Sequence, residues 1–296
     1  MQLSEITPLI LTYNERPNIS RTLAKLTWAS RIVVVDSLST DGTRQILESD
    51  PRVFIVTREF VSFADQCNVG LEQIDTEWVL SLDADYICTS EFVAEIAALP
   101  PSPAQNGFRA AFKYCINGTP LRGSLYPPRT VLYRRDRAHY VSDGHAHRVV
   151  VEGETGRLAS VILHDDRKPL ESWLRAQQRY AAKEAEKLLS TPPAELGVND
   201  RIRRHGWIAP LVMPLYCLLW KRLILDGRPG FEYTFQRTYA EMLLSLHLSA
   251  STAERAVAQN RHGSAPLPAT QGGGGASPQR GSMQRPVRGA APERDY

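Results

Sequence analysis

Four short apolar runs in the first 82 residues limit most strongly how this chain can fold. Each run is almost free of polar residues, and an amphipathic stretch separates it from the next. Such runs are typical of strands buried on both faces of a parallel sheet, and their alternation with helical stretches predicts an α/β fold. We therefore expect a doubly wound sheet that binds ligands beyond the carboxyl ends of its strands. The runs are residues 9–11, 32–35, 53–56 and 78–82.

Polar residues follow three of these runs directly: Tyr13, Asp36, and the pair Asp83 and Asp85. The carboxyl ends of parallel strands meet at one edge of a sheet, so we expect these side chains to line one site. Asp83 and Asp85 are two positions apart and point the same way, and two adjacent carboxylates require a cation between them. Mg²⁺ or Mn²⁺ bound to a diphosphate satisfies that requirement. A pair of solvated loop acids is the alternative interpretation of the same spacing.

The charge distribution does not favour a nucleic-acid partner. The chain has 35 basic and 32 acidic residues, but six arginines and three acids lie in residues 251–296, so the rest of the chain is balanced. No global positive field is therefore expected. The four cysteines form no Cys-X-X-Cys pair, which indicates neither a disulfide framework nor a zinc site and is typical of a reducing compartment. The first ten residues lack the pattern of a secretory signal.

Residues 207–220 form a run of fourteen uncharged, mostly apolar residues with a tryptophan at each end. A helix of this length reaches about 21 Å, which is shorter than a hydrocarbon core of about 30 Å. Pro210 and Pro214 also argue against a simple span. We expect a segment lying in the plane of an anionic membrane surface, with a buried core helix as the alternative. The flanking cations are Arg201, Arg203, Arg204, Lys221 and Arg222.

Four motifs, in this order and with these gaps, make the chain resemble the inverting family 2 glycosyltransferases with the GT-A fold. The resemblance is strongest to enzymes that elongate lipopolysaccharide core or extracellular polysaccharide. It implies a nucleotide-sugar donor, usually linked to UDP, and a divalent metal. The motifs are residues 8–15 (PLILTYNE), 34–43 (VVDSLSTDGT), 66–68 (QCN) and 82–85 (LDAD).

The resemblance also implies roles for single residues. Asp85 would bind the metal, His164 would complete its ligand shell, and Asp83 would approach the ribose or the sugar. Local sequence leaves simpler roles open: Asp36 as a turn cap, Arg58 as a solvated charge, and His164 as a loop residue before the next helix. The residues that would hold the donor are Tyr13, Glu15, Asp36 and Arg58.

An inverting transfer needs a base that removes the proton of the acceptor hydroxyl. In the family this base is an acidic residue after the metal motif. Residues 141–147 are the matching stretch here, although they lack the His-Glu or Glu-Asp pair of many relatives. We expect Asp143 to be the base, with His145 as the alternative. Arg129 and Arg134 are either acceptor or diphosphate contacts or surface arginines.

These observations give a complete working prediction. Residues 1–100 would bind the nucleotide sugar, residues 101–190 the acceptor, and residues 191–250 would form a helical, membrane-associated extension. Residues 251–296, rich in Gly and Pro near their end, would form a disordered tail. The protein would transfer a sugar to a glycan or lipid-linked saccharide at the inner face of the cytoplasmic membrane. The alternative is a catalytically inactive glycan-binding or scaffold protein of the same fold.

Overall fold

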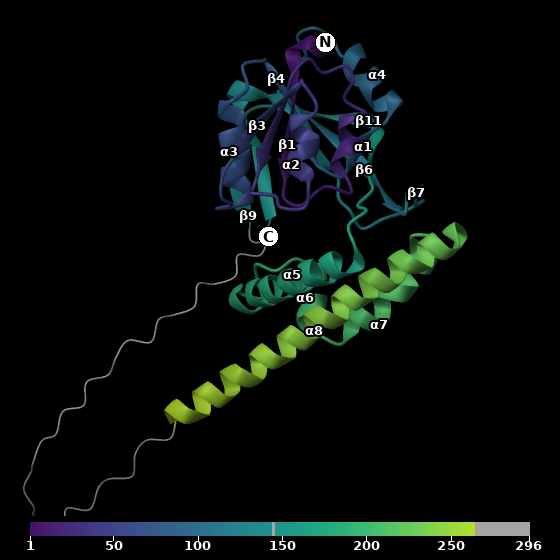
Figure 1. Ribbon diagram of the computed structural model, residues 1–296. Coiled ribbons are helices and arrows are strands. Elements are labelled where there is room, and N and C mark those ends of the chain that lie inside the picture. The colour runs from purple at the N-terminus through teal and green to yellow at the C-terminus, as the bar shows by residue number, and fades with distance from the viewer. Residues whose placement is uncertain (144–145, 264–296) are drawn as a thin grey trace, which may run out of the picture.

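The computed structural model describes residues 1–143 and 146–263 (Figure 1). Within these ranges nine strands form one mixed sheet in the order β3-β2-β1-β4-β8-β6-β11-β5, and β7 pairs with β6. Two further strands, β9 and β10, form a separate antiparallel pair. The predicted mixed α/β sheet is confirmed. The strands are β1 (Ile6–Thr12), β2 (Ile32–Asp36), β3 (Val53–Thr57), β4 (Trp78–Asp83), β5 (Tyr86–Cys88), β6 (Gly107–Ile116), β7 (Thr119–Pro120), β8 (Arg129–Arg134), β9 (Ala138–Asp143), β10 (Ala146–Val151) and β11 (Thr155–His164).

Helices cover both faces of the sheet, which explains why its central strands are apolar throughout. Every residue of β2 is buried, because Ile32 and Val34 face one core and Val33 and Val35 face the other. The first core is closed by α1 (Ile19–Leu23), α2 (Thr43–Glu48) and α4 (Ser90–Ala98). The second is closed by α3 (Phe63–Glu72).

One edge of the sheet collects most strand ends. Strands β1, β2, β3 and β4 are parallel to one another. Strand β8 is antiparallel to both β4 and β6, and β11 is parallel to β6, so six strands end at the same carboxyl edge. Strand β5 turns back after Asp85 and pairs with β11, which sets Tyr86 opposite His164. This pairing brings residues 82–85, the fourth sequence motif, beside the end of β11.

The C-terminal helices lie beyond this carboxyl edge (Figure 1). Helix α5 (Leu170–Ser190) packs against α8 (Arg228–Gly263) through Ala181, Leu188, Leu244 and Leu248. The Arg203 guanidinium lies 2.8 Å from Glu184 and 3.1 Å from Glu241, which ties α6 to both long helices. Helix α6 is Val198–Arg204. Three short elements connect it to α8: helix α7 (Ile208–Leu215), the π-helical segment η3 (Tyr216–Trp220) and the 3-10 turn η4 (Leu223–Asp226).

Two expectations about this part of the chain need comment. The predicted tail begins too early, because α8 continues to Gly263. Residues 251–263 are rich in Ala, Glu, Arg and Gln, which favour a helix, and the Gly- and Pro-rich composition starts only after them. Residues 264–296 lie outside the described part of the chain. Among the described helices, none is both long and apolar enough to cross a membrane.

Candidate active site

The loops that follow β1 and β2 are fastened to each other by side chains of the family motifs. Asn14 adopts a left-handed backbone conformation with φ of 54°, and its side-chain oxygen accepts a hydrogen bond from the Thr40 amide at 2.8 Å. The Glu15 amide donates to the Thr43 hydroxyl at 2.7 Å, and the Arg16 amide donates to Asp41 at 3.0 Å. The two loops therefore form one prearranged surface at the carboxyl edge.

Asp36 is the centre of this surface. Its buried carboxylate accepts hydrogen bonds from the Thr12 hydroxyl at 2.9 Å, the Ser39 hydroxyl at 2.5 Å and the Ser39 amide at 3.0 Å. Each carboxylate oxygen thus has a partner from the chain itself. In the structure Asp36 organises the loop, which matches the turn-capping alternative. Tyr13 is half-buried and directly follows Thr12, the residue of β1 that pairs with Asp36.

Asp85 and His164 show the opposite situation. Asp85 Oδ2 lies 3.1 Å from His164 Nε2, whereas Asp85 Oδ1 and His164 Nδ1 are buried and have no hydrogen-bond partner among the described residues. Burial lowers the pKa of His164, but the charge of Asp85 and the bond to it outweigh burial and raise it above the usual value. Buried polar atoms without partners are rare, and a bound ion or water is one arrangement that would satisfy this pair.

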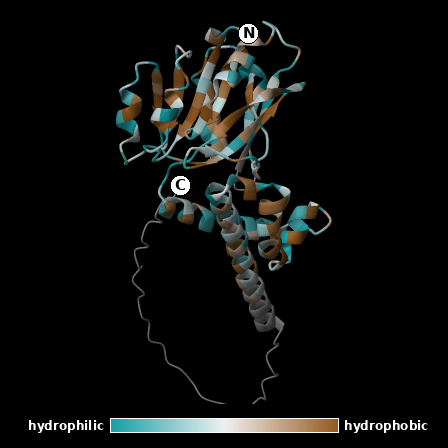
Figure 2. Cartoon of the chain, turned by 90° about the vertical axis from the view of Figure 1, so that its right-hand side faces the viewer, coloured by the Kyte–Doolittle hydropathy of each residue, from teal (hydrophilic) through white to brown (hydrophobic). Residues whose placement is uncertain are grey.

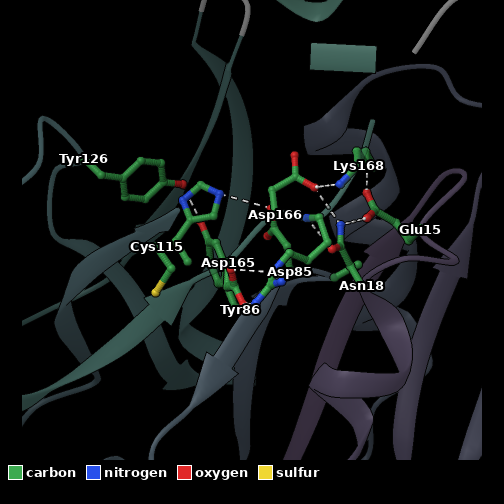
Figure 3. A network of polar contacts seen from close by, with 12 residues as sticks. Glu15, Asn18, Asp85, Tyr86, Cys115, Tyr126, Asp165, Asp166 and Lys168 are labelled. Atoms are coloured by element: carbon green, nitrogen blue, oxygen red, sulfur yellow. Dashed lines mark hydrogen bonds and ion pairs between the residues drawn. The ribbon is translucent and has the colours of Figure 1, made fainter. Parts of the chain in front are cut away.

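The imidazole of His164 packs against three tyrosine side chains. The ring centroids of Tyr114, Tyr126 and Tyr86 lie 4.8, 4.7 and 5.3 Å from that of the imidazole. The hydroxyls of Tyr86 and Tyr126 are hydrogen-bonded to each other, as Figure 3 shows. Arg129 lies over the Tyr126 ring at 4.9 Å, so a cation also reaches this region.

A polar network joins the loop after β1 to the end of β11 (Figure 3). The buried Asn18 amide donates to Glu15 and to Asp166, each at 2.8 Å, and the Lys168 ammonium donates to Glu15. Asp165 holds the next residues in place, because it accepts from Arg21 at 2.6 Å and from the Gly118 amide at 3.0 Å.

Burial and the neighbouring charges of Lys168 and Asp85 set the pKa of Glu15. Burial raises the pKa of Glu15 to about 7; Lys168 opposes this shift and the charge of Asp85 adds to it. Burial lowers the pKa of Lys168, but Glu15 outweighs that effect and raises it. The charge of Asp85 is therefore one of the causes of the raised pKa of Glu15.

Asp85 and His164 fit one side of a divalent metal site. They present one carboxylate and one imidazole, and the unpartnered Oδ1 atom supplies a free lone pair. Mg²⁺ and related cations are often held by one or two protein ligands together with substrate phosphates. No group of three or more His, Cys, Asp or Glu side chains able to hold a metal occurs in residues 1–143 and 146–263. The remaining ligands would have to come from the substrate and water.

The arginines singled out from the sequence have different positions. Arg58 forms an ion pair of 2.7 Å with Asp65 at the start of α3, which is its role in the structure. Arg129, at the start of β8, remains at the carboxyl edge. Arg134 lies at the other end of β8, where it pairs with Glu77 and packs over Trp78, so it is not part of the site.

Strand β9, which ends at Asp143, is held in place by Asn68 of the third sequence motif (residues 66–68). The Asn68 side chain donates to the Tyr140 carbonyl at 3.0 Å and accepts from the Tyr140 amide at 2.9 Å, as a neighbouring strand would. The Tyr140 hydroxyl also donates to Ser81 in β4 at 2.7 Å. Since β9 starts near the amino end of β4, Asp143 ends the strand on the side of the carboxyl edge. The Asp143 side chain and the whole of His145 lie outside the described residues.

Several site residues could not be identified from single motifs. Asn18, Arg21, Asp165 and Lys168 connect the two halves of the edge, but their contacts span more than 140 positions. The only signal was the dense run of charged residues after His164. Likewise, the Thr22 hydroxyl donates to the Ala84 carbonyl at 2.6 Å and so fixes the backbone between Asp83 and Asp85.

Comparison with known proteins agrees with the motif-based resemblance. Residues 9–119 match the family described as "Glycosyl transferase family 2", so the resemblance is confirmed over that range. The chain is 25% identical over 267 residues to the lipopolysaccharide core biosynthesis glycosyltransferase LpsC of Rhizobium meliloti (strain 1021). That alignment covers 77% of this chain and 96% of LpsC.

Two solved structures are similar at low sequence identity. S. aureus TarS 1-349 in complex with UDP-GlcNAc is 14% identical with a TM-score of 0.44, and the match covers 86% of this chain and 92% of that one. Glucosyl-3-phosphoglycerate synthase from Mycobacterium tuberculosis, in complex with Mn²⁺, UDP and phosphoglyceric acid, is 14% identical with a TM-score of 0.42. That match covers 65% of this chain and 81% of the synthase.

Proposed function

Since this chain carries a glycosyltransferase family 2 domain at residues 9–119, we propose that it moves a sugar from a nucleotide-diphosphate sugar to a glycan or lipid-linked acceptor, with inversion. The donor nucleotide is UDP in this proposal. The observation that carries it is the pair Asp85 and His164, whose buried atoms lack partners at the carboxyl edge of the sheet.

The described residues divide the work of binding the donor. Asp85 and His164 would hold Mg²⁺ or Mn²⁺, which supplies positive charge to the diphosphate of the leaving group. Arg129 adds a second positive charge on the same side: burial lowers its pKa, but Tyr86, Tyr126 and Asp83 outweigh burial and raise it. In the proposal, the loops around Tyr13 and Asp36 face the nucleoside, and Asp83 approaches the ribose or the sugar.

Asp143 is the proposed base, with His145 as the alternative. It takes the proton of the acceptor hydroxyl while that oxygen bonds to the anomeric carbon and the bond to the diphosphate breaks. The electron pair leaves with the nucleoside diphosphate, so no general acid is required. The position of Asp143 at the end of β9, on the side of the carboxyl edge, supports this role.

Binding and transfer can be tested separately. In thermal unfolding, UDP together with Mn²⁺ should raise the melting temperature of the protein, because a ligand that binds only the folded state stabilises that state. Asp143→Asn should keep this shift and lose transfer, measured as UDP released from UDP-sugars in the presence of acceptor. Asp136→Asn, an exposed acid in the 3-10 turn just before β9, is the control and should keep both. Full activity of Asp143→Asn would transfer the role to His145, tested with His145→Gln.

An exposed apolar surface supports the proposed location at the inner face of the cytoplasmic membrane. Large apolar side chains of α7, η3 and η4 are exposed, and Trp207 and Trp220 are 69% and 77% exposed. This exposure argues against the buried-core alternative for residues 207–220. Figure 2 shows the hydrophobic colour on the short helices beside α8. We name this surface the apolar face: Trp207, Leu211, Leu215, Leu219, Trp220 and Leu225.

The charges around the apolar face favour an anionic bilayer as its partner. Arg222 and Arg228 are exposed, and Lys221 lies 5.6 Å from the Tyr216 ring. Asp226, the acidic residue between the two arginines, is already bonded to Arg122 at 3.1 Å. Tryptophans with flanking cations are typical of segments at the headgroup level of a membrane.

Vesicle sedimentation tests this location. The protein should bind vesicles of phosphatidylcholine with phosphatidylglycerol more tightly than vesicles of phosphatidylcholine alone, and salt should weaken the binding. Replacing Trp207 and Trp220 together by Ser should reduce binding at least about tenfold. Val61→Ser, an exposed apolar residue on the sheet domain, should leave binding unchanged. Absence of vesicle binding by the wild-type protein would remove the membrane from the proposal.

A further inference from the structure

A cavity of about 80 Å³ lies between the carboxyl edge and the C-terminal helices, and the donor site does not account for it. Tyr114 and Tyr126 contribute from the sheet domain, Trp173 comes from α5, and α8 supplies three side chains. The Leu125 amide donates to the Tyr233 hydroxyl at 2.8 Å, which fixes the loop that bears Tyr126 against α8. The α8 residues are Tyr233, Gln236 and Arg237.

The cavity is directly adjacent to the proposed metal site. Tyr114 and Tyr126 line the cavity, and the same two rings lie 4.8 and 4.7 Å from the His164 ring. A group bound in the cavity is therefore about one aromatic ring away from Asp85 and His164.

The wall chemistry suits a sugar ring. Four of the lining residues, Tyr114, Tyr126, Trp173 and Tyr233, are aromatic, and their faces offer flat apolar surfaces on which the C–H groups of a pyranose pack. Gln236 adds an amide that can both donate and accept hydrogen bonds. Aromatic walls with a few polar groups are typical of small-molecule sites.

Arg237 makes the cavity favourable for a negatively charged group. Its Nε atom is buried and has no hydrogen-bond partner among the residues that the structure describes. Glu241, one turn further along α8, is already bonded to Arg203 at 3.1 Å. A buried guanidinium Nε–H without an acceptor is unfavourable, and a carboxylate or phosphate matches the donor geometry of the guanidinium.

We propose that this cavity is an acceptor subsite for a saccharide that bears a carboxylate or a phosphate, with Arg237 as the specificity-determining residue. The proposal rests on the proposed function, since it places the acceptor beside the donor. The cavity of about 80 Å³ is smaller than a pyranose ring, so the acidic group enters it toward Arg237 while the ring packs against the aromatic side chains at its opening.

Ligand-observed NMR titrations of the full chain test the subsite with small probes. Methyl β-D-glucuronide and glucose 6-phosphate should bind, and methyl β-D-glucoside should bind at least about tenfold more weakly. Arg237→Gln should weaken binding of methyl β-D-glucuronide by a similar factor, and Trp173→Ala should weaken binding of both acidic sugars. Arg157→Gln, an exposed arginine near the start of β11 at the opposite edge of the sheet, is the matched control and should have no effect.

Three results would overturn the subsite. They are equal binding of glucoside and glucuronide, unchanged glucuronide binding in a folded Arg237→Gln variant, and inorganic phosphate binding as tightly as glucose 6-phosphate. The melting shift with UDP and Mn²⁺ is measured on the same samples. Wild-type protein that binds glucuronide but not UDP would contradict the proposed donor site, whereas binding of UDP without glucuronide would contradict the subsite alone.

Discussion

Two parts of the carboxyl edge use acidic residues in opposite ways. In the loops after β1 and β2, the Asp36 carboxylate is bonded on both oxygens by Thr12 and Ser39. At the junction of β4 and β11, Asp85 Oδ1 and His164 Nδ1 are buried without partners in the described chain. The first arrangement is complete without a ligand and the second is not. In this comparison, Asp36 belongs to the scaffold, and the unsatisfied atoms of Asp85 and His164 at the end of the strands are the ones that a bound cation would satisfy.

The largest expected effect is that of Asp85→Asn. The amide keeps the shape of the side chain but removes the charge that would hold the cation, so transfer should fall at least about a hundredfold, or about 2.7 kcal/mol. The melting shift produced by UDP with Mn²⁺ should disappear, while the melting temperature without ligand changes little. A variant that keeps the Mn²⁺-dependent shift would place the metal elsewhere.

Asp36→Ala should act on the fold itself. It leaves the buried donors of Thr12 and Ser39 without an acceptor, and each such loss costs about 1–3 kcal/mol. Urea unfolding should show a decrease in the free energy of unfolding of about 2–4 kcal/mol. Asp75→Ala is the matched control, because the Asp75 side chain is 92% exposed, and its effect should stay below about 0.5 kcal/mol. Equal effects of the two variants would contradict the scaffold role of Asp36.

The pH dependence of stability sharpens the contrast through Glu15. Its pKa is about 7 in the folded protein, above the ordinary value of 4.5, so the folded state holds this proton more tightly. The resulting stabilisation is complete below about pH 4.5 and is lost as pH rises through about 7. Wild-type protein should therefore lose about 2–3 kcal/mol more than Glu15→Gln between pH 5 and 8 in urea unfolding. Identical slopes for the two proteins would show that Glu15 is not the group responsible.

The sequence was sufficient to predict the positions of the first four strands and the shared edge at which their carboxyl ends meet. A strand such as β2, buried on both faces, has no polar positions, and this leaves a pattern that can be recognised directly. Because parallel strands end together, Asp36, Asp83 and Asp85 could be assigned to one edge before their distances were known. The same argument identifies the region of a site but not which of its carboxylates needs a ligand.

The remainder depends on pairing that no local pattern encodes. Arg129 and Arg134 are both close in sequence to Tyr126, but β8 runs away from the carboxyl edge, so only Arg129 stays at the site. His164 meets Asp85 only because β5 is antiparallel to β11 in one particular register. The partnership of Glu15 with Lys168 spans more than 150 residues. Each of these facts is a property of the assembled sheet.

Asn68 offers the mildest test, since it belongs to the scaffold but supports the strand that ends at Asp143. Its side chain makes two hydrogen bonds with the backbone of Tyr140. Asn68→Ala should lower the free energy of unfolding by about 1 kcal/mol, because water can replace part of what is lost. If β9 positions the base, kcat should fall about tenfold while the UDP-dependent melting shift is unchanged, since the donor site is untouched. Asn68→Asp keeps the acceptor for the Tyr140 amide and should recover part of kcat. A loss of stability with unchanged kcat would mean that Asn68 anchors β9 without positioning the base.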